Sequence, residues 1–573
     1  MAAGFSPPPG GDPRWSAGQP APQSFADERQ AGTPAPPHPG KHLSQFRPAA
    51  LFFILECVGL QPLDLAIIAV YLIGITLFGV SFRRSEGTLK NYFLGGRNIP
   101  WWAISLSIVA GETSILTIIS TPGLAYTGDF AFLQLVFGYL LGRIVICVVL
   151  LPHYFKGELF TAYELMQRRF GTRLKSLSAA IFLGGRAMAE GVRLWALAIV
   201  GGVVLDALPR LGLHWHFDNL EIIGIIAFLT LIYTFEGGMK AVIWTDFIQI
   251  CIYVSGAILS FFLILRGIPG GWAHVAQLAT AAHKFRLWHF AFSWTQPFTF
   301  WAGLIGGMFL TTATDGTDQL IVQRLLSAKS ERDSRRALLS SWVIIFFQFV
   351  LFLFIGVLLW VFYQSHALPA AGQFGKYDRL YPAYIARYFP IGLAGLLIAA
   401  IIAAAMSNLS AALNALSSTT IMDFYRPHFN PGRTEKHYLR MSRLATVGWT
   451  VVLAAVAYAS RDSRSVLIAG LAVISYPFSA LLGVFLLGTM TRRTNEFGAI
   501  IGMILGVIVA VALGLAGLPF TWFIVGGTVT TFVTGYAFSW LRPAPPQPAG
   551  PDGAAAPHTA PRTARVRPAE SAP

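Results

Sequence analysis

Long apolar runs alternate with short polar and basic segments over most of this chain of 573 residues. An α-helix needs about 20 predominantly apolar residues to cross the hydrocarbon core of a membrane. Thirteen runs reach or approach this length, at residues 64–83, 101–125, 131–152, 176–206, 219–236, 241–266, 292–315, 337–363, 389–422, 441–460, 465–488, 498–517 and 519–541. The pattern predicts an all-α integral membrane protein with about 13 transmembrane helices, all within residues 49–541.

The composition agrees with a membrane protein and narrows its class. Hydrophobic residues make up 54% of the chain and charged residues 12%, with a mean hydropathy of +0.58. Residues 1–48 and 542–573 are rich in Pro, Ala, Gly and Ser without periodicity, so we expect two disordered tails. The three cysteines are too scattered for a disulfide framework or a metal cluster. No HExxH or GxSxG motif occurs, so we expect no enzyme.

The basic residues predict the orientation of the helices. With the N-terminus outside, 26 of the 42 Lys and Arg residues fall on the inner side and 13 on the outer side. Because Lys and Arg accumulate in cytoplasmic loops, this bias favours an outside N-terminus and a cytoplasmic C-terminus in a plasma membrane, which in a bacterium is the inner membrane. The net charge of +15 then needs no nucleic acid as partner.

Two of the apolar runs contain residues that interrupt a helix. Residues 101–128 carry Gly111, Glu112 and Pro122-Gly123, and five spans later residues 292–315 carry three glycines and lead into a Thr- and Asp-rich stretch, 311–316. Interrupted helices at corresponding positions of two halves are typical of transporters with inverted repeats. We therefore expect a 5+5 inverted repeat over about residues 101–488, with one helix before it and two after it. The alternative is that Gly303, Gly306 and Gly307 only pack against a neighbouring helix.

Ionisable residues inside apolar runs are further candidates for function, because a charge in the membrane is costly. Six lie within or near the ends of spans: Glu112, Arg143, Arg186, Glu190, Arg193 and Asp246. The spacing of Arg186, Glu190 and Arg193 places them on one helix face, where they either form a self-compensating network or leave Arg193 to bind a carboxylate. Glu112 and Arg143 can pair across neighbouring spans. Asp246 either attracts a cation or proton from the inner side or simply meets water there.

Oxygen-bearing residues in the ninth run predict a cation site. Ala404, Ser407 and Asn408 are spaced i, i+3 and i+4, so their oxygens share one face of a helix. Together with backbone carbonyls near Ala110 and Thr113 they would supply about five oxygen ligands for Na⁺. Tight packing of small residues against a neighbouring helix is the alternative explanation for this pattern of residues.

Several motifs, in order, carry a family resemblance. They are FLGGRNIPWW at 93–102, GGMKAVIWTDFIQ at 237–249, TDQLIVQRLLSAKS at 317–330, SNLSAALNALSSTTIMDFY at 407–425 and RRTNEFGAIIGMILG at 492–506. Over residues 60–540 the chain resembles the sodium:solute symporter family, which includes sugar, proline and sialic-acid transporters. The resemblance implies a LeuT-like fold and sodium as the coupling ion, without an organic cofactor.

The resemblance also implies site residues. By position, the sodium ligands correspond to Ala110, Thr113, Ala404, Ser407 and Asn408, and Asn408 stands where the family usually has Ser or Thr. Asp246 matches an acid that the family uses for a second sodium ion or for ion exit. The hexose-binding positions become Thr117, Val136, Tyr139, Thr311 and Leu471, which disfavours a sugar.

A carboxylate-bearing or zwitterionic small solute fits the remaining residues better. The expected substrate-binding residues are Glu112, Ser114, Thr117, Arg143, Arg193, Thr311 and Thr314. Arg193 or Arg143 would hold an anion, and Glu112 would hold an amine or pair with an arginine. The sequence thus predicts a secondary active transporter for sodium-coupled symport by alternating access. Proton coupling through Glu112 or Asp246 is an alternative, and a transport-like membrane sensor is an alternative of another class.

Overall fold

The computed structural model describes residues 59–81, 98–156, 162–206, 218–233, 239–368, 377–426, 429, 432–461 and 465–541. The two predicted tails, part of the first and second family motifs and several basic residues that entered the orientation argument lie outside the described residues. The described part is helical, without strands, and a single isolated bridge joins Ile99 to Ala328.

Every predicted apolar run contains a helix, although the run at 292–315 becomes helical only at Phe300. The corresponding elements are α1 (Pro62–Ser81), α3 (Trp101–Glu112) with α4 (Ile115–Thr127), α5 (Leu133–Val145) with η4 (Ile146–Leu150) and α6 (Leu151–Tyr154), α8 (Thr172–Leu205), α9 (Asn219–Tyr233), α10 (Met239–Arg266), α12 (Phe300–Thr317), α14 (Glu331–Ser365), α16 (Leu393–Thr419) with η6 (Thr420–Tyr425), α18 (Glu435–Ala459), α19 (Val466–Met490), α20 (Glu496–Leu515) and α21 (Phe520–Phe538). Eight helices of the described part are long and apolar enough to cross a membrane, and the bent pair α3–α4 makes a ninth.

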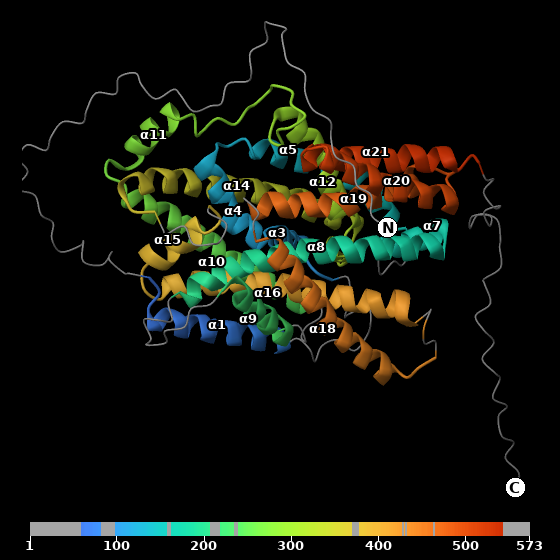
Figure 1. Cartoon of the computed structure of the whole chain (residues 1–573), viewed down its shortest axis with the longest axis horizontal. Coiled ribbons are helices and arrows are strands. Elements are labelled where there is room, and N and C mark those ends of the chain that lie inside the picture. The colour runs from blue at the N-terminus through green and yellow to red at the C-terminus, as the bar shows by residue number, and fades with distance from the viewer. Residues whose placement is uncertain are drawn as a thin grey trace, which may run out of the picture. The chain divides into compact units, whose positions relative to one another are not determined.

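In the described part of the chain, four short helices lie between the predicted spans: α7 (Ala162–Phe170), α11 (Gly271–Ala281), α13 (Gln319–Leu326) and α15 (Leu380–Tyr388). Figure 1 shows the long helices running side by side, with α20 and α21 next to α19, and α1 next to α16. The helix α14 packs along both halves of the broken pair, α3 and α4. These contacts place the break in the interior of the helix bundle.

The break in the second span is confirmed, although not at the residues that suggested it. The axes of α3 and α4 meet at 63°, and the chain turns at Thr113 and Ser114. The Ser114 hydroxyl caps α4 by accepting the backbone N–H of Leu116 at 3.2 Å, which satisfies a donor that the helix start leaves unpaired. Gly111 lies inside α3, and Pro122-Gly123 lies inside α4 without ending it.

The predicted break in the seventh span is wrong. The helix α12 continues through residues 311–316 and ends at Thr317. The hydroxyls of Thr312, Thr314 and Thr317 donate to the carbonyls four residues earlier, at 2.7, 3.0 and 2.7 Å. These hydroxyls therefore find hydrogen-bond partners along an intact helix. The sequence alone had suggested that the helix is interrupted here.

The glycines of α12 serve helix packing, which was the alternative explanation. A Cβ atom at Gly307 would lie 2.4 Å from the carbonyl oxygen of Leu135, and one at Gly303 would lie 2.9 Å from the backbone of Gln134. Both contacts are with α5 or its first turn. Without side chains at these positions the two helices approach closely.

Gly138, on the α5 side of this contact, provides a test of the packing. A Cβ atom there would lie 2.5 Å from the carbonyl oxygen of Gly303, so Gly138→Ala forces the backbones apart and should lower the stability of the protein by about 1–3 kcal/mol. Gly184→Ala is the matched control, because a Cβ atom at that helical position meets nothing within 4 Å and alanine favours the helix by about 1 kcal/mol. The measurement is the melting temperature of each purified variant in detergent, and equal melting temperatures would contradict the packing role.

A buried acid lies in the connection between α14 and α15. The carboxylate of Asp378 is almost inaccessible to solvent and accepts the backbone N–H of Val466, the first residue of α19, at 3.0 Å. Burial raises the pKa of Asp378 from 3.8 to about 6, because desolvation disfavours the charged form. The folded protein therefore holds this proton over a pH range in which the unfolded chain has already released it.

This pKa predicts a pH-dependent stability. Because the folded protein binds this proton more tightly than the unfolded chain, Asp378 contributes to stability fully below about pH 4. This contribution to the free energy of unfolding is lost as the pH rises to about 6. Asp378→Asn keeps an acceptor for Val466 and removes the buried charge, so it should raise stability at pH 7.5 by up to about 3 kcal/mol and much less at pH 4.5. We would compare the melting temperatures of variant and parent protein at both pH values. A difference that does not change with pH would refute the prediction.

Candidate functional site

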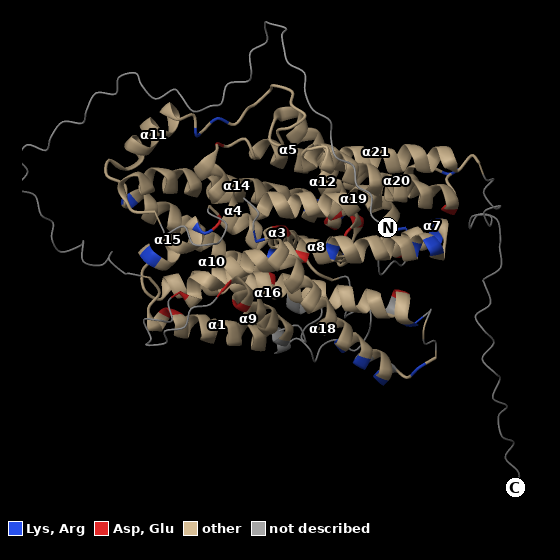
Figure 2. Ribbon diagram, viewed as in Figure 1, with Lys and Arg blue, Asp and Glu red and all other residues tan. Residues whose placement is uncertain are grey.

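A cavity of about 140 Å³ lies beside the break between α3 and α4. Its wall is built from α3, α4, α5, α8, α12, α13, α14, α16 and α19, together with the residues that join these helices. The polar lining residues are Glu112, Thr113, Ser114, Thr117, Tyr139, Arg186, Arg193, Thr311, Thr314, Asp315, Asp318, Arg324 and Asn408. Figure 2 shows charged residues around α3 and α8, between helices that are otherwise uncharged over much of their length.

Six of the seven expected substrate-binding residues line this cavity. They are Glu112, Ser114, Thr117, Arg193, Thr311 and Thr314. Arg143 does not line it: its side chain is completely buried on α5, behind the wall. The positions that correspond to the hexose site also converge here, since Thr117, Tyr139, Thr311 and Leu471 line the cavity and Val136 does not.

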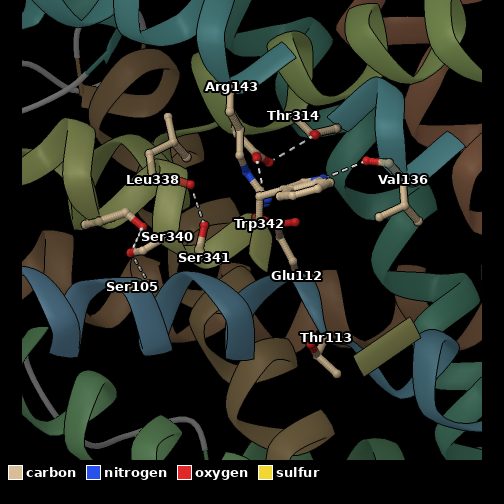
Figure 3. Close-up of polar contacts among 12 residues, drawn as sticks. Ser105, Glu112, Thr113, Val136, Arg143, Thr314, Leu338, Ser340, Ser341 and Trp342 are labelled. Atoms are coloured by element: carbon tan, nitrogen blue, oxygen red, sulfur yellow. Dashed lines mark hydrogen bonds and ion pairs between the residues drawn. The ribbon is translucent and has the colours of Figure 1, made fainter. Parts of the chain in front are cut away.

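Arg143 pairs with two carboxylates. It forms an ion pair with Glu112 at the end of α3, and the same Nη2 atom lies 3.5 Å from the carboxylate of Asp315 on α12. Figure 3 shows Arg143 pointing toward Glu112, with Thr314 close by, and the Thr314 hydroxyl donates to Asp315 at 3.2 Å. The predicted pair of Arg143 and Glu112 is confirmed, and the structure adds Asp315 as a second acid on the same guanidinium.

The three charged residues in the middle of α8, Arg186, Glu190 and Arg193, form the predicted network. Glu190 pairs with Arg186 at 2.8 Å and also with Arg193. Arg186 reaches further, to Asp318, at 2.7 Å. Asp318 is the N-cap of α13, where its other oxygen accepts the backbone N–H of Leu320 at 2.9 Å. Nothing in the local sequence joins Asp318 to this network, because Asp318 lies 132 residues from Arg186.

Asp246 is buried and paired. Its carboxylate accepts the Ser107 hydroxyl at 2.9 Å and the Arg324 guanidinium at 3.2 Å. Arg324, in α13, also donates from Nε to Ser107 at 2.9 Å, so the three residues connect α10, α3 and α13. The side chain of Asp246 is only 4% exposed. The alternative that Asp246 simply meets water is therefore wrong. Nothing in the local sequence of Arg324 places it near Asp246, which lies 78 residues away in the chain.

Of the residues expected to bind sodium, Ala110 and Thr113 lie at the break itself, and Asn408 lines the cavity beside it. No backbone N–H of the described residues donates to the carbonyls of Ala110 and Thr113, as expected where a helix is interrupted. The Thr113 hydroxyl is engaged by Gln348 of α14 at 2.9 Å. On α16, which contacts α4, Asn408 lines the cavity. Ser407 directly precedes Asn408 in α16. Ala404, which is buried, lies about one helical turn before both residues.

Comparison with known proteins identifies the kind of protein that this site belongs to. The model of the sodium:solute symporter family matches residues 92–506. The chain belongs to this family. Two relatives are each 30% identical: the sodium/sialic acid symporter SiaT of Proteus mirabilis, over 82% of this chain and 94% of the relative, and the sodium/sialic acid symporter NanT of Aliivibrio fischeri, over 84% and 94%.

Solved structures support the fold of this sodium:solute symporter. A sodium-coupled sialic acid symporter, solved in a substrate-bound outward-open state, has a TM-score of 0.71 at 28% identity and covers 85% of this chain and 99% of that one. Mhp1, a nucleobase-cation-symport-1 family transporter solved in a closed conformation, has a TM-score of 0.52 at 12% identity and covers 78% and 94%, respectively. The predicted LeuT-like, all-α membrane fold is confirmed.

Family membership also confirms the predicted class of function. The protein is an integral membrane transporter, not an enzyme, and it couples the symport of a small solute to sodium by alternating access. Sodium is the coupling ion.

Proposed function

We propose that this protein imports a small polar organic solute that bears a carboxylate, either as an anion or as a zwitterion, and that the solute binds in the cavity beside the helix break. The observation that carries the proposal is Arg193, which lines the cavity and has an Nε atom without a hydrogen-bond partner among the described residues. A guanidinium is well suited to bind a carboxylate through two hydrogen bonds. SiaT and NanT are named for sialic acid, which is itself a carboxylate.

The lining hydroxyls complete this solute site. Ser114 and Thr117 come from α4 and its cap, and Thr311 and Thr314 from α12. Arg143 acts indirectly, because its side chain is buried behind Glu112 and Asp315 and holds both carboxylates in place. The small cavity favours a compact solute, since ligand pockets for larger molecules enclose about 300 Å³ or more.

We place sodium between the helix break and α16. The ligands would be the carbonyls of Ala110, Thr113 and Ala404 with the side-chain oxygens of Ser407 and Asn408. The side chains of Ser407 and Asn408 make no hydrogen bond to another described residue. The carbonyls of Ala110 and Thr113 accept no backbone N–H of the described residues. Oxygens without partners in a protein interior are what a hard cation needs.

The transport cycle follows from the position of these groups. The membrane potential favours sodium entry by about 2.3 kcal/mol per charge for each 100 mV. Bound sodium joins the end of α3 to α16 and thereby favours one conformation, which is the condition for coupling. Asp246 then offers a second ion site or an exit path toward the cytoplasm, once Arg324 moves away from it.

The proposed orientation places the N-terminus outside and the C-terminus in the cytoplasm of the plasma membrane, the inner membrane in a bacterium. The distribution of basic residues supports it, with 26 on the inner side against 13 on the outer side. Fluorescent and phosphatase reporters fused to the C-terminus test it. Phosphatase activity, which requires an external location, would refute it.

The decisive experiment is uptake into proteoliposomes that contain the full-length protein. Radiolabelled carboxylates and amino acids are offered with an inward sodium gradient, with potassium in place of sodium, and with a pH gradient alone. We expect sodium-dependent uptake of at least one of them. Uptake driven by the pH gradient without sodium would instead show proton coupling, and binding without uptake would favour the membrane sensor.

Arg193 provides the matching variant test. Arg193→Ala should weaken the apparent affinity for a transported carboxylate by roughly tenfold or more, the effect of losing a charge-assisted hydrogen bond. Arg193→Lys keeps the charge and should retain part of the affinity. An unchanged affinity of Arg193→Ala for every transported carboxylate would refute the proposed role.

A further inference from the structure

The ionised side chains around the cavity fall into ion-paired clusters, and two of these clusters are electrically balanced. In the first, two arginines face two acids, and in the second one arginine faces one acid. The members are Arg186, Arg193, Glu190 and Asp318 in the first and Arg324 and Asp246 in the second. When all these side chains are ionised, neither cluster carries a net charge.

The third cluster is not balanced. Glu112 and Asp315 share a single cation, Arg143, and the same nitrogen atom of Arg143 serves both. No other Lys or Arg of the described residues forms an ion pair with either acid. With all three groups ionised, this cluster carries one excess negative charge.

The excess charge faces the cavity. Glu112 and Asp315 both line the cavity, whereas Arg143 is completely buried and does not line it. The rings of Phe132, Tyr139 and Phe349 line the same space. Carboxylates and aromatic rings are the two kinds of groups that attract an organic cation in a partly dry site.

An uncompensated carboxylate in the interior of a membrane protein is unfavourable, because the low dielectric constant there neither solvates nor screens it. A cation that enters the cavity relieves this cost. We propose that the transported solute carries a primary or secondary ammonium group that binds between Glu112 and Asp315, while its carboxylate binds Arg193. The solute class is therefore an amine-bearing zwitterion of the amino-acid type.

The total charge of the occupied site agrees with this assignment. With all of these side chains ionised, the three clusters together carry one negative charge, and one sodium ion at the proposed site neutralises it. A zwitterion then leaves the loaded site neutral, whereas an anion such as a simple monocarboxylate would leave an excess negative charge. A neutral loaded site is the arrangement that a conformational change inside a membrane tolerates best.

The inference rests on the proposed function. Pairs of probes with and without an amine test the inference separately from that function. Purified full-length protein is heated in sodium chloride with a panel of standard amino acids and β-alanine. Each is compared, at equal concentration, with the amine-free acid of the same carbon skeleton. A ligand that binds only the folded state raises the melting temperature. We expect at least one amine-bearing acid to raise it, and its amine-free counterpart to have no effect.

Two variants assign the effect to the acids. Glu112→Gln and Asp315→Asn each leave Arg143 one carboxylate partner, so the fold should survive. Each should weaken the apparent affinity for the amine-bearing probe by roughly tenfold or more. Glu112→Asp keeps the charge and is the matched control, for which we expect partial retention. The melting temperature without any probe reports whether each variant is folded.

Any one of the following results would overturn the inference. They are equal stabilisation by amine-free acids, no stabilisation by any probe, and unchanged affinity for the amine in both Glu112→Gln and Asp315→Asn. If the same variants instead abolish the stabilisation by sodium alone, the two acids bind sodium and not an ammonium group. Sodium-dependent uptake of an amine-free acid would leave the proposed symport intact and refute only the amine site.

Discussion

Replacement of Arg143 by alanine is expected to lower the stability of the protein by about 3–5 kcal/mol, the usual effect of removing one partner from a buried ion pair. The side chain is completely buried, and its removal leaves Glu112 and Asp315 facing each other without a cation. We would measure the melting temperature and the yield of monodisperse protein after extraction in detergent. We expect a large loss in both.

A triple variant separates this electrostatic effect from the loss of side-chain volume. Arg143→Leu combined with Glu112→Gln and Asp315→Asn removes every charge of the cluster and fills most of the space. Neutral side chains of similar size often replace a buried ion pair without a large loss of stability, so the triple variant should regain most of what Arg143→Ala loses. An equally unstable triple variant would show that packing, not charge, is the role of Arg143.

Ser407→Ala is expected to raise the sodium concentration required for half-maximal uptake by roughly tenfold or more, because a hydrogen-bonding or coordinating oxygen on a charged group contributes about 1.5–3 kcal/mol. The physical reason is the loss of one oxygen from a site with about five. The measurement is solute uptake into proteoliposomes at increasing sodium concentration, together with the melting temperature in sodium, potassium and choline chloride.

Ser417→Ala is the control for Ser407→Ala. Ser417 is on the same helix but nearly three turns further along, and its hydroxyl donates to the carbonyl of Asn414 at 3.2 Å. This variant should keep the sodium response of the parent protein. An unchanged sodium requirement in Ser407→Ala would remove Ser407 from the ligand set. If the parent protein itself shows no response to sodium, the result would indicate that Asn408 disables the site.

Apolar periodicity and length were sufficient to predict the helices. Every predicted run contains a helix because the membrane imposes the same length and hydrophobicity on each span, independent of its neighbours. The break in the second span could also be predicted, because a charged Glu112 beside Gly111 is unfavourable in a lipid-exposed helix. The exact turn, at Thr113 and Ser114, depends on the hydroxyl of Ser114 as an N-cap.

The predicted break in the seventh span was wrong because glycine and threonine residues are compatible both with an interrupted helix and with a closely packed one. Glycines and threonines either interrupt a helix or allow close packing, and their hydroxyls bond equally well to water or to carbonyls of their own helix. Only the approach of α5 to Gly303 and Gly307 distinguishes the two. Local sequence holds no information about that neighbour.

The sequence by itself determined the class of this protein, its helices, the broken second span and the residue types of the site. Tertiary structure alone decided how the charges are shared. It joined Arg324 to Asp246, Asp318 to Arg186 and Asp315 to Arg143, across 78, 132 and 172 residues of chain. The physical reason is that hydrophobicity and helix length act locally, whereas the energy of a buried charge depends on which opposite charge the fold brings within a few ångströms.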